Sequence, residues 1–327
     1  MLSSMTRTKI IYTVMKEIQR PISIGYYFPE GEDWRTYPAI KVTTTEVSRY
    51  CAMPLEFAMY RGIKKMWSCE LGDNCWATFP DTEMYNAVLT DRNGNIVAQK
   101  KWNPIEGGDF LYQALYLYCM RLTNEGKKPK GIAIGTHDGA SGEWVPVVQE
   151  NLTDACLVEA SQPQFAKLVH NYQKYPNVKL VNQLITTEGQ DIEFFEGGKG
   201  YTNSVVERVI RDWETEEIKS SIRSSCSIND LIGNYISSGE RLDWLHLDVE
   251  GYDADLLRAL EQPLPPFIIF ENYPSHHKEE LEYNEQQKKR IQTYLRDNGY
   301  DIVYGMVTQA TDVSCLATLP HEPQNIN

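Results

Sequence analysis

The stretch Leu245-His246-Leu247-Asp248-Val249-Glu250-Gly251 joins an apolar run to two carboxylates and a glycine. A helical pattern with Leu256, Leu257 and Leu260 follows it. An apolar run of this length before an amphipathic helix is typical of a buried strand in a parallel sheet. Buried carboxylates are costly unless they bind something, so this strand end predicts a ligand site at the carboxyl edge of the sheet.

Two more junctions of this kind lie upstream. The strand predicted at 132–135 leads into Thr136-His137-Asp138-Gly139-Ala140-Ser141-Gly142, and the strand predicted at 156–159 ends in Glu159. A glycine-rich turn that leads into a helix offers backbone amides to an anionic group. Glu159 lies where nucleoside-binding sheets place the acid that accepts the ribose hydroxyls. Together, the three junctions predict a site for a nucleoside cofactor.

The composition is that of an ordinary globular protein. The 327 residues, 42% of them hydrophobic, are enough for one large domain and a smaller one. The net charge of -13 argues against a nucleic-acid partner, because such binding depends on Lys and Arg. The apolar run 10–12 is too short for a signal peptide or a membrane span, so we expect a cytoplasmic protein without a membrane partner. The seven cysteines include no Cys-x-x-Cys, which disfavours structural zinc.

From 131 to about 317, short apolar runs alternate with helical patterns, which predicts a doubly wound α/β sheet. Further strands are expected at 178–185, 244–249 and 267–270. The spacing of Ser161 and Gln164 predicts a capping box at the start of the helix after the second strand. Two last strands, near 301–306 and 313–317, are joined by a turn too short for a helical crossover, so we expect them to be antiparallel.

The first 125 residues differ from the rest and are rich in aromatic side chains. A hairpin is predicted at 87–97, turning on Asn93-Gly94, and a helix at 110–122. We therefore expect an α+β accessory region at 1–125, the cofactor domain at 126–320 and a tail at 321–327. The aromatic composition predicts that the accessory region selects the acceptor or forms a homo-oligomeric interface. A polar insertion at about 196–225, helical around 205–218, is either a lid or a solvated excursion.

The glycine spacing favours one nucleoside cofactor over another. Gly135, Gly139 and Gly142 lack the Gly-x-Gly-x-x-Gly pattern that brings backbone amides close to a pyrophosphate. S-adenosylmethionine has an amino-acid end instead, and its carboxylate suits a glycine-rich turn at a helix N-terminus. An antiparallel last strand is also typical of the sheets of class I methyltransferases. The sequence therefore predicts S-adenosylmethionine as the cofactor.

Residues 131–318 resemble the FkbM-type S-adenosylmethionine-dependent methyltransferases. The family's Asp-Val-Gly-Ala-Asn-x-Gly is similar to residues 133–139, its Glu-Pro-x-x-x-x-Phe-x-x-Leu-x-x-Asn to 159–171, its Thr-Leu-Asp-Asp-Leu to 227–231, and its Lys-Ile-Asp-Val-Glu-Gly to 246–251. The last of these is the most specific. Ala133, His137 and His246 stand where the family has aspartate, asparagine and lysine. The resemblance implies a class I, Rossmann-like fold and methyl transfer to a hydroxyl of a sugar or secondary metabolite.

The predicted site collects side chains from the ends of the first, second and fourth strands. Cofactor contacts are expected from Gly135, Thr136, His137, Asp138, Gly139, Ser141, Glu159, Ala160 and Asp248. Asp248 is the first candidate for the base that accepts the hydroxyl proton, and His246 and Glu250 are further catalytic candidates. The alternatives are a hydrogen-bonded core histidine and helix-capping carboxylates. We expect no metal, although Asp248, Glu250 and Glu271 are oxygen ligands that would suit magnesium.

Two other functions stay open. A nicotinamide-dependent oxidoreductase would need a pyrophosphate loop that this chain does not show. A methyltransferase-like interaction module without turnover is suggested by Ala133 and His246. Binding of S-adenosylhomocysteine, of NAD or of neither distinguishes the three functions.

Overall fold

The computed structural model describes residues 24–25, 41–42, 67–71, 74–80, 85–90, 96–102, 110–197, 203–207, 210–211, 218–271, 289–291, 293–304 and 314–318. The chain divides into two compact units, one of Met1–Phe110 with Val303–Met306 and one of Leu111–Ile302 with Val307–Asn327. No helix in the part of the chain described here is long and apolar enough to cross a membrane.

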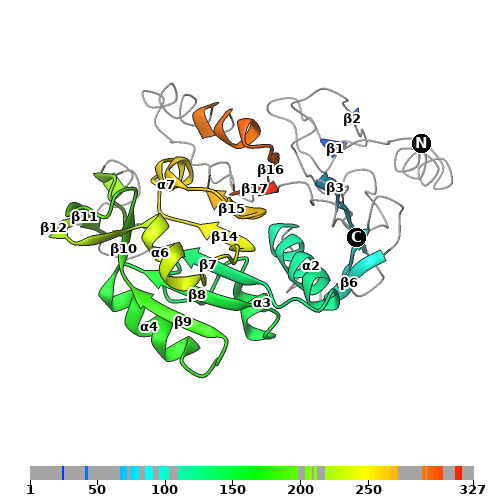
Figure 1. Ribbon diagram of the computed structural model, residues 1–327, viewed down its shortest axis with the longest axis horizontal. Helices are drawn as coiled ribbons and strands as arrows, with labels where there is room; N and C mark the ends of the chain where they lie inside the picture. The colour runs from blue at the N-terminus through cyan, green and yellow to red at the C-terminus, as the bar shows by residue number, and fades with distance from the viewer. Residues whose placement is uncertain are drawn as a thin grey trace, which may run out of the picture. The chain divides into compact units, whose positions relative to one another are not determined.

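The central sheet is mostly parallel, with the strand order β16-β17-β15-β14-β7-β8-β9 (Figure 1). Its strands are β7 Lys130–Ile134, β8 Asp154–Glu159, β9 Val178–Asn182, β14 Trp244–Leu247, β15 Phe267–Glu271, β16 Asp301–Tyr304 and β17 Ser314–Thr318. β14 pairs in parallel with β7 and β15, β8 pairs in parallel with β7 and β9, and β17 runs antiparallel to β15. The predicted α/β fold on a mostly parallel sheet is confirmed.

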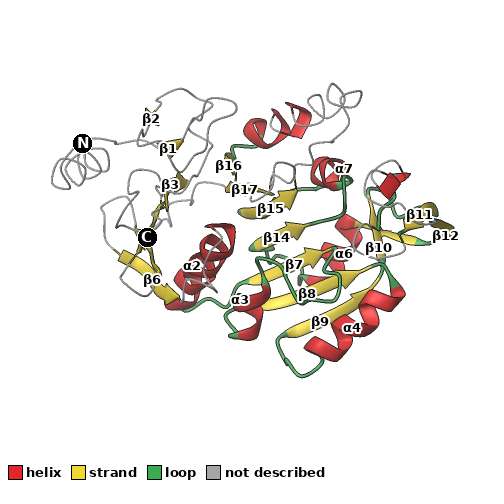
Figure 2. Ribbon diagram, turned by 180° about the vertical axis from the view of Figure 1, so that it is seen from behind, coloured by secondary structure: helices red, strands yellow, loops and turns green. Residues whose placement is uncertain are grey.

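The inner strands are buried on both faces. Every residue of β14 is buried, as are the last four residues of β7. Because helices cover both faces of such a sheet, its strands are nearly continuous apolar runs and do not alternate between apolar and polar residues. Figure 2 shows α4 beside β8 and β9, which it contacts. The helices of this unit include α2 Phe110–Asn124, α3 Val145–Gln149, α4 Gln162–Tyr172, α6 Ile228–Tyr235 and α7 Asp253–Ala259, and residues 289–291 and 293–297 are helical as well.

Helix α2 belongs almost wholly to the second unit, whereas the sequence placed it in the accessory region 1–125. The Tyr118 ring stacks on Phe267 of β15 with a centroid separation of 4.7 Å. The Tyr116 hydroxyl donates a hydrogen bond to Glu150, which follows α3. These contacts fix α2 against the central sheet.

Two small sheets lie in the chain between β9 and α6. β10 (Leu184–Thr186) is parallel to β13 (Ser225–Ser227), and β11 (Ile192–Glu196) is antiparallel to β12 (Lys219–Arg223). The strand predicted at 178–185 is therefore two strands, β9 and β10. The helix predicted at 205–218 falls mostly outside the described residues.

In the described residues of the first unit, strands form two antiparallel sheets. β1 (Ile24–Gly25) pairs with β2 (Lys41–Val42). The second sheet has the order β3-β4-β5-β6, with β3 Trp67–Leu71, β4 Asn74–Pro80, β5 Tyr85–Thr90 and β6 Ile96–Trp102. β5 pairs antiparallel with β6, as the predicted hairpin requires, and the Asn93-Gly94 turn predicted for it lies outside the described residues.

The start of α4 differs from the predicted capping box. Ser161 is the N-cap residue, but its side chain makes no capping hydrogen bond. Its backbone N–H instead donates to Glu159 Oε1 at 2.7 Å. The spacing of Ser161 and Gln164 in the sequence could not show that the backbone N–H of this N-cap residue would bind the Glu159 carboxylate. This hydrogen bond connects the start of α4 to a residue that lines the cavity.

Gly131 of β7 lies against the ring of Trp244 in the neighbouring strand. A Cβ at position 131 would lie 1.7 Å from Trp244 Cε2, and the ring is fully buried with Nε1 donating to Thr153 Oγ1. We expect Gly131→Ala to lower the free energy of unfolding by about 2 kcal/mol, measured by urea denaturation, because the ring cannot move without straining the core.

Gly233→Ala in α6 is the matched control for this substitution. Apart from Gly233, its chain neighbours and the backbone of its own helix, no atom lies within 4 Å of the position that its Cβ would take. Alanine is the better helix former, so the control should be neutral or more stable by about 0.5 kcal/mol. A Gly131→Ala protein as stable as this control would contradict the packing argument.

Candidate active site

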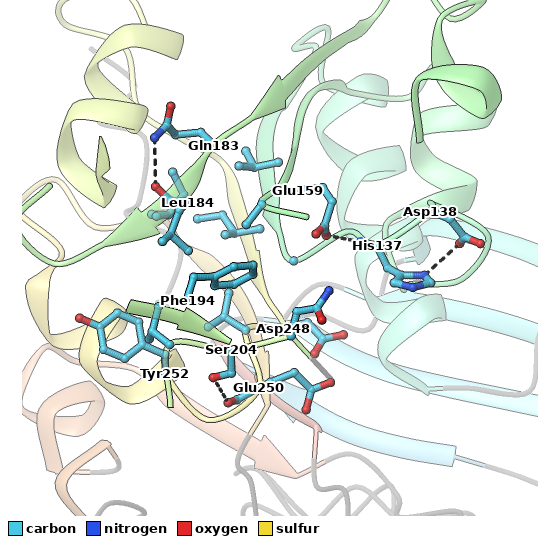
Figure 3. A pocket seen from close by; sticks show the side chains of 18 of the residues that line it. His137, Asp138, Glu159, Gln183, Leu184, Phe194, Ser204, Asp248, Glu250 and Tyr252 are labelled. Carbon is cyan, nitrogen blue, oxygen red and sulfur yellow. Dashed lines mark hydrogen bonds and ion pairs between the residues drawn. The ribbon is translucent and has the colours of Figure 1, made fainter. Parts of the chain in front are cut away.

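A cavity of about 380 Å³ opens at the carboxyl edge of β7, β8 and β14 (Figure 3). Residues from six segments line it: 134–141, 158–160, 183–185, 194, 203–205 and 248–252. The carboxyl edge is where open α/β sheets bind ligands, because the loops there can diverge to make a crevice. The volume lies in the range of small-molecule sites, about 300–1,000 Å³.

Gly135 brings the ends of β7 and β14 together. Its φ is 80°, and a Cβ there would lie 1.7 Å from the Asp248 carbonyl oxygen. Only glycine accepts both the left-handed backbone and this close approach. The Asp248 N–H donates to the Ile134 carbonyl at 3.1 Å. The glycine turn and the carboxylate strand end therefore form one continuous cavity wall.

Glu159 is held rigidly at the end of β8. Its Oε2 accepts a hydrogen bond from the His137 backbone N–H at 2.8 Å and its Oε1 one from Ser161 N–H at 2.7 Å. Figure 3 shows the contact with His137. The residue is 6% exposed, and burial raises the pKa of its carboxyl although both amides favour the ionised form. Each oxygen keeps a lone pair for a further donor, which suits a pair of ribose hydroxyls.

Asp248 and Glu250 follow β14 directly and both line the cavity. Glu250 has a φ of 52°, which is uncommon for a residue with a side chain. Its carbonyl oxygen accepts a hydrogen bond from Ser204 Oγ at 2.8 Å, drawn in Figure 3. This bond ties the turn of the two carboxylates to the segment after β11.

His246 lies on β14, two residues before Asp248, and is not among the residues that line the cavity. Its Nε2 lies 2.8 Å from Glu143 Oε2, and the side chain is 5% exposed. Burial alone would lower the pKa of His246, but the carboxylates of Glu143, Asp248 and Asp253 together outweigh burial and raise it. The structure thus places this histidine in a buried ion pair.

Asp253, at the start of α7, is a further buried carboxyl near the site. Burial and the Asp248 carboxylate raise its pKa to about 7. Its Oδ1 accepts a hydrogen bond from Glu271 N–H at 3.3 Å. The Asp253 carboxyl therefore ionises near neutral pH and interacts with the Asp248 carboxylate.

The structure brings most of the predicted site residues together. The predicted residues that line the cavity are Gly135, His137, Asp138, Ser141, Glu159, Ala160, Asp248 and Glu250. Three predicted residues do not line it. The Thr136 hydroxyl donates to the Val158 carbonyl, Gly139 packs against Tyr172, and His246 pairs with Glu143.

Several lining residues were not predicted from the sequence. Four of them adjoin predicted residues in the chain, namely Ile134, Ala140, Val158 and Val249, and the eight others are Gln183, Leu184, Ile185, Phe194, Asn203, Ser204, Val205 and Tyr252. Most come from β10, β11 and the segment after β11, whose small sheets pair residues far apart in the chain. The turn residue Tyr252 is the exception, because its place directly after the two carboxylates and Gly251 was a usable signal.

A metal site is not formed by the described side chains. Among them, no three His, Cys, Asp or Glu residues are grouped so that they could hold a metal ion. The alternative magnesium set of Asp248, Glu250 and Glu271 is therefore not such a group.

The chain is an α/β protein with a mostly parallel sheet, and its cavity lies at the carboxyl edge, where open α/β sheets bind ligands. Residues 134–302 match the model of the methyltransferase FkbM domain. This match covers more than half of the chain, and the chain belongs to the FkbM methyltransferase family. A search of curated proteins found no match.

Solved structures show distant likenesses. An O-methyltransferase from Bacillus cereus, in complex with SAH, is 12% identical over 64% of this chain and 79% of its own, with a TM-score of 0.38. The fibrillarin pre-rRNA processing protein of Methanococcus jannaschii is 12% identical over 79% and 95%, with a TM-score of 0.38. A precorrin-6Y C5,15-methyltransferase from Geobacter metallireducens is 12% identical over 58% and 81%, with a TM-score of 0.31. The family assignment depends on the family model and not on these likenesses.

Proposed function

We propose that this protein transfers a methyl group from S-adenosylmethionine to a hydroxyl of a small molecule, such as a sugar or secondary metabolite. The observation that carries the proposal is the buried Glu159 carboxylate, which lines a small-molecule cavity beside a glycine turn in a chain of the FkbM methyltransferase family. This arrangement combines the acceptor for ribose hydroxyls with backbone that can approach a ligand closely.

The residues of the cavity fit the cofactor. Glu159 would accept the ribose hydroxyls, and the turn from Gly135 to Ser141 would receive the amino-acid end. When bound, S-adenosylmethionine supplies an electrophilic methyl group. The protein orients the acceptor, excludes water and accepts a proton, and the Asp248 carboxylate at the cavity wall is the proposed proton acceptor.

S-adenosylhomocysteine is expected to raise the melting temperature, because a ligand that binds only the folded state stabilises it by mass action. At a hundred times its Kd, the stabilisation is about 2.7 kcal/mol. Differential scanning fluorimetry over a range of ligand concentrations measures the shift. NAD serves as the control ligand, since it shares the adenosine part but requires a pyrophosphate loop.

The same experiment discriminates the competing functions. A shift with NAD and none with S-adenosylhomocysteine would replace methyl transfer by nicotinamide-dependent oxidoreduction. No shift with either ligand would support an interaction module without turnover. Methylation of a hydroxyl compound, detected as a mass increase of one methylene, completes the test for the acceptor class.

A further inference from the structure

The segment between the glycine turn and α3 is held on one side by α4. The Asn171 side-chain amide donates to the Asp138 carbonyl at 2.8 Å. The Tyr172 hydroxyl donates to the Gly139 carbonyl at 2.8 Å. The Ala140 N–H donates to Asp138 Oδ1 at 2.9 Å, and the buried Trp144 ring lies 5.4 Å from the Tyr172 ring, so α4 restrains the segment at both of its ends.

An ion pair between Glu143 and His246 ties the segment to β14. Glu143 Oε2 lies 2.8 Å from His246 Nε2, and the side chains are 17% and 5% exposed. Glu143 is two residues beyond Ser141, and His246 is two residues before Asp248, and both Ser141 and Asp248 line the cavity. The pair therefore ties together the two walls between which the ligand would lie.

The surroundings of His246 supply no other hydrogen-bond partner. Its Nδ1 is buried and unpartnered in the described structure. The residues opposite it in the neighbouring strands, Ala133 of β7 and Ile269 of β15, are uncharged. The ionisable groups that face it are Glu143, Asp248 and Asp253. Removal of either member of such a buried pair leaves an uncompensated polar group.

We propose that Glu143 and His246 are positioning residues, whose ion pair holds Ala140 and Ser141 in the conformation that receives the amino-acid end of the cofactor. The proposal rests on the proposed function, because it concerns the same cavity. Neither residue is catalytic in this scheme, since neither lines the cavity and His246 Nε2 already contacts a carboxylate.

The pair should make ligand binding depend on pH. Glu143 raises the pKa of His246 above its ordinary value, so the pair is intact below that raised pKa and is lost as the pH rises through it. Affinity for S-adenosylhomocysteine should therefore fall at alkaline pH. Asp253, with a pKa of about 7, ionises in the same range and needs its own control.

The test measures the Kd of S-adenosylhomocysteine by calorimetry from pH 6.5 to 9 for the wild type and three variants. The wild-type affinity should fall by about tenfold, a typical coupling between two sites. His246→Lys keeps a cation opposite Glu143 throughout this range, so its Kd should stay near the wild-type value at pH 6.5. Glu143→Gln should bind weakly at every pH. Asp253→Asn should keep the wild-type pH dependence.

Hydrogen exchange provides a readout that needs no ligand. In Glu143→Gln, the amides of residues 140–145 should exchange at least about tenfold faster, while those of α4 stay unchanged. Unchanged exchange, or a His246→Lys protein with the wild-type pH dependence, would overturn the positioning proposal. If the wild type fails to bind S-adenosylhomocysteine, the proposed function falls, and hydrogen exchange still decides whether the pair holds the segment.

Discussion

Replacement of Glu159 with alanine is expected to weaken S-adenosylhomocysteine binding by about a hundredfold or more. Two ribose hydroxyls would lose a charged acceptor, and each hydrogen bond to a charged group contributes about 1.5–3 kcal/mol. The carboxylate is already oriented by the backbone amides of His137 and Ser161, so little ordering is needed when a ligand binds. The loss of these hydrogen bonds should therefore appear as a higher Kd for S-adenosylhomocysteine.

Calorimetry on folded protein measures this loss. The same substitution frees the amides of His137 and Ser161, so the unliganded melting temperature must be recorded for each variant. Glu193→Ala, at an exposed acid of β11 outside the cavity, is the matched control and should bind as the wild type does. Unchanged affinity in a folded Glu159→Ala protein would remove Glu159 from the cofactor site.

Replacement of Asp248 with asparagine should lower turnover by about a hundredfold or more. Asparagine keeps the shape of the side chain and removes its ability to take a proton from the acceptor hydroxyl. Asp248 lines the cavity directly after β14, and its backbone is fixed by the hydrogen bond to Ile134. His246→Gln should reduce the single-turnover rate less, because His246 does not line the cavity and its Nε2 is paired with Glu143.

Single-turnover methyl transfer to an identified acceptor, with the Kd of the cofactor measured in parallel, separates chemistry from binding. Asp255→Asn on α7, outside the cavity lining, is the control. If cofactor binding is intact and His246→Gln is the more severe change, the base is His246 and the positioning proposal is wrong. If neither change affects the rate, catalysis is by positioning only or the acceptor is not a hydroxyl.

Local sequence was sufficient to predict the parallel strands and the site residues that follow directly after them. The apolar runs at β7, β8, β14 and β15 are all buried, so their position follows from hydrophobic patterning alone. Because the strands are parallel, the polar residues that follow these runs lie together at the carboxyl edge of the sheet. Hence Gly135, Glu159 and Asp248 could be placed in one cavity before any tertiary structure was known.

The helices were predictable as elements but not as packing partners. The period of α2 is visible in the sequence, yet its docking against β15 depends on Tyr118 meeting Phe267, far along the chain. Likewise, Ser161 has the spacing of a capping box, but Glu159 binds its N–H instead. Periodicity reports which face of a helix is apolar and does not report what that face will cover.

Tertiary structure alone decided the rest of the cavity and the state of His246. Phe194 and Ser204 enter the cavity because small sheets pair distant residues, and no local pattern encodes such pairing. The sequence shows His246 on an apolar strand but not that Glu143, separated by 103 positions, would neutralise its charge. The charge and contacts of a buried group depend on which other groups the fold brings within hydrogen-bond distance, and that is a property of the folded chain.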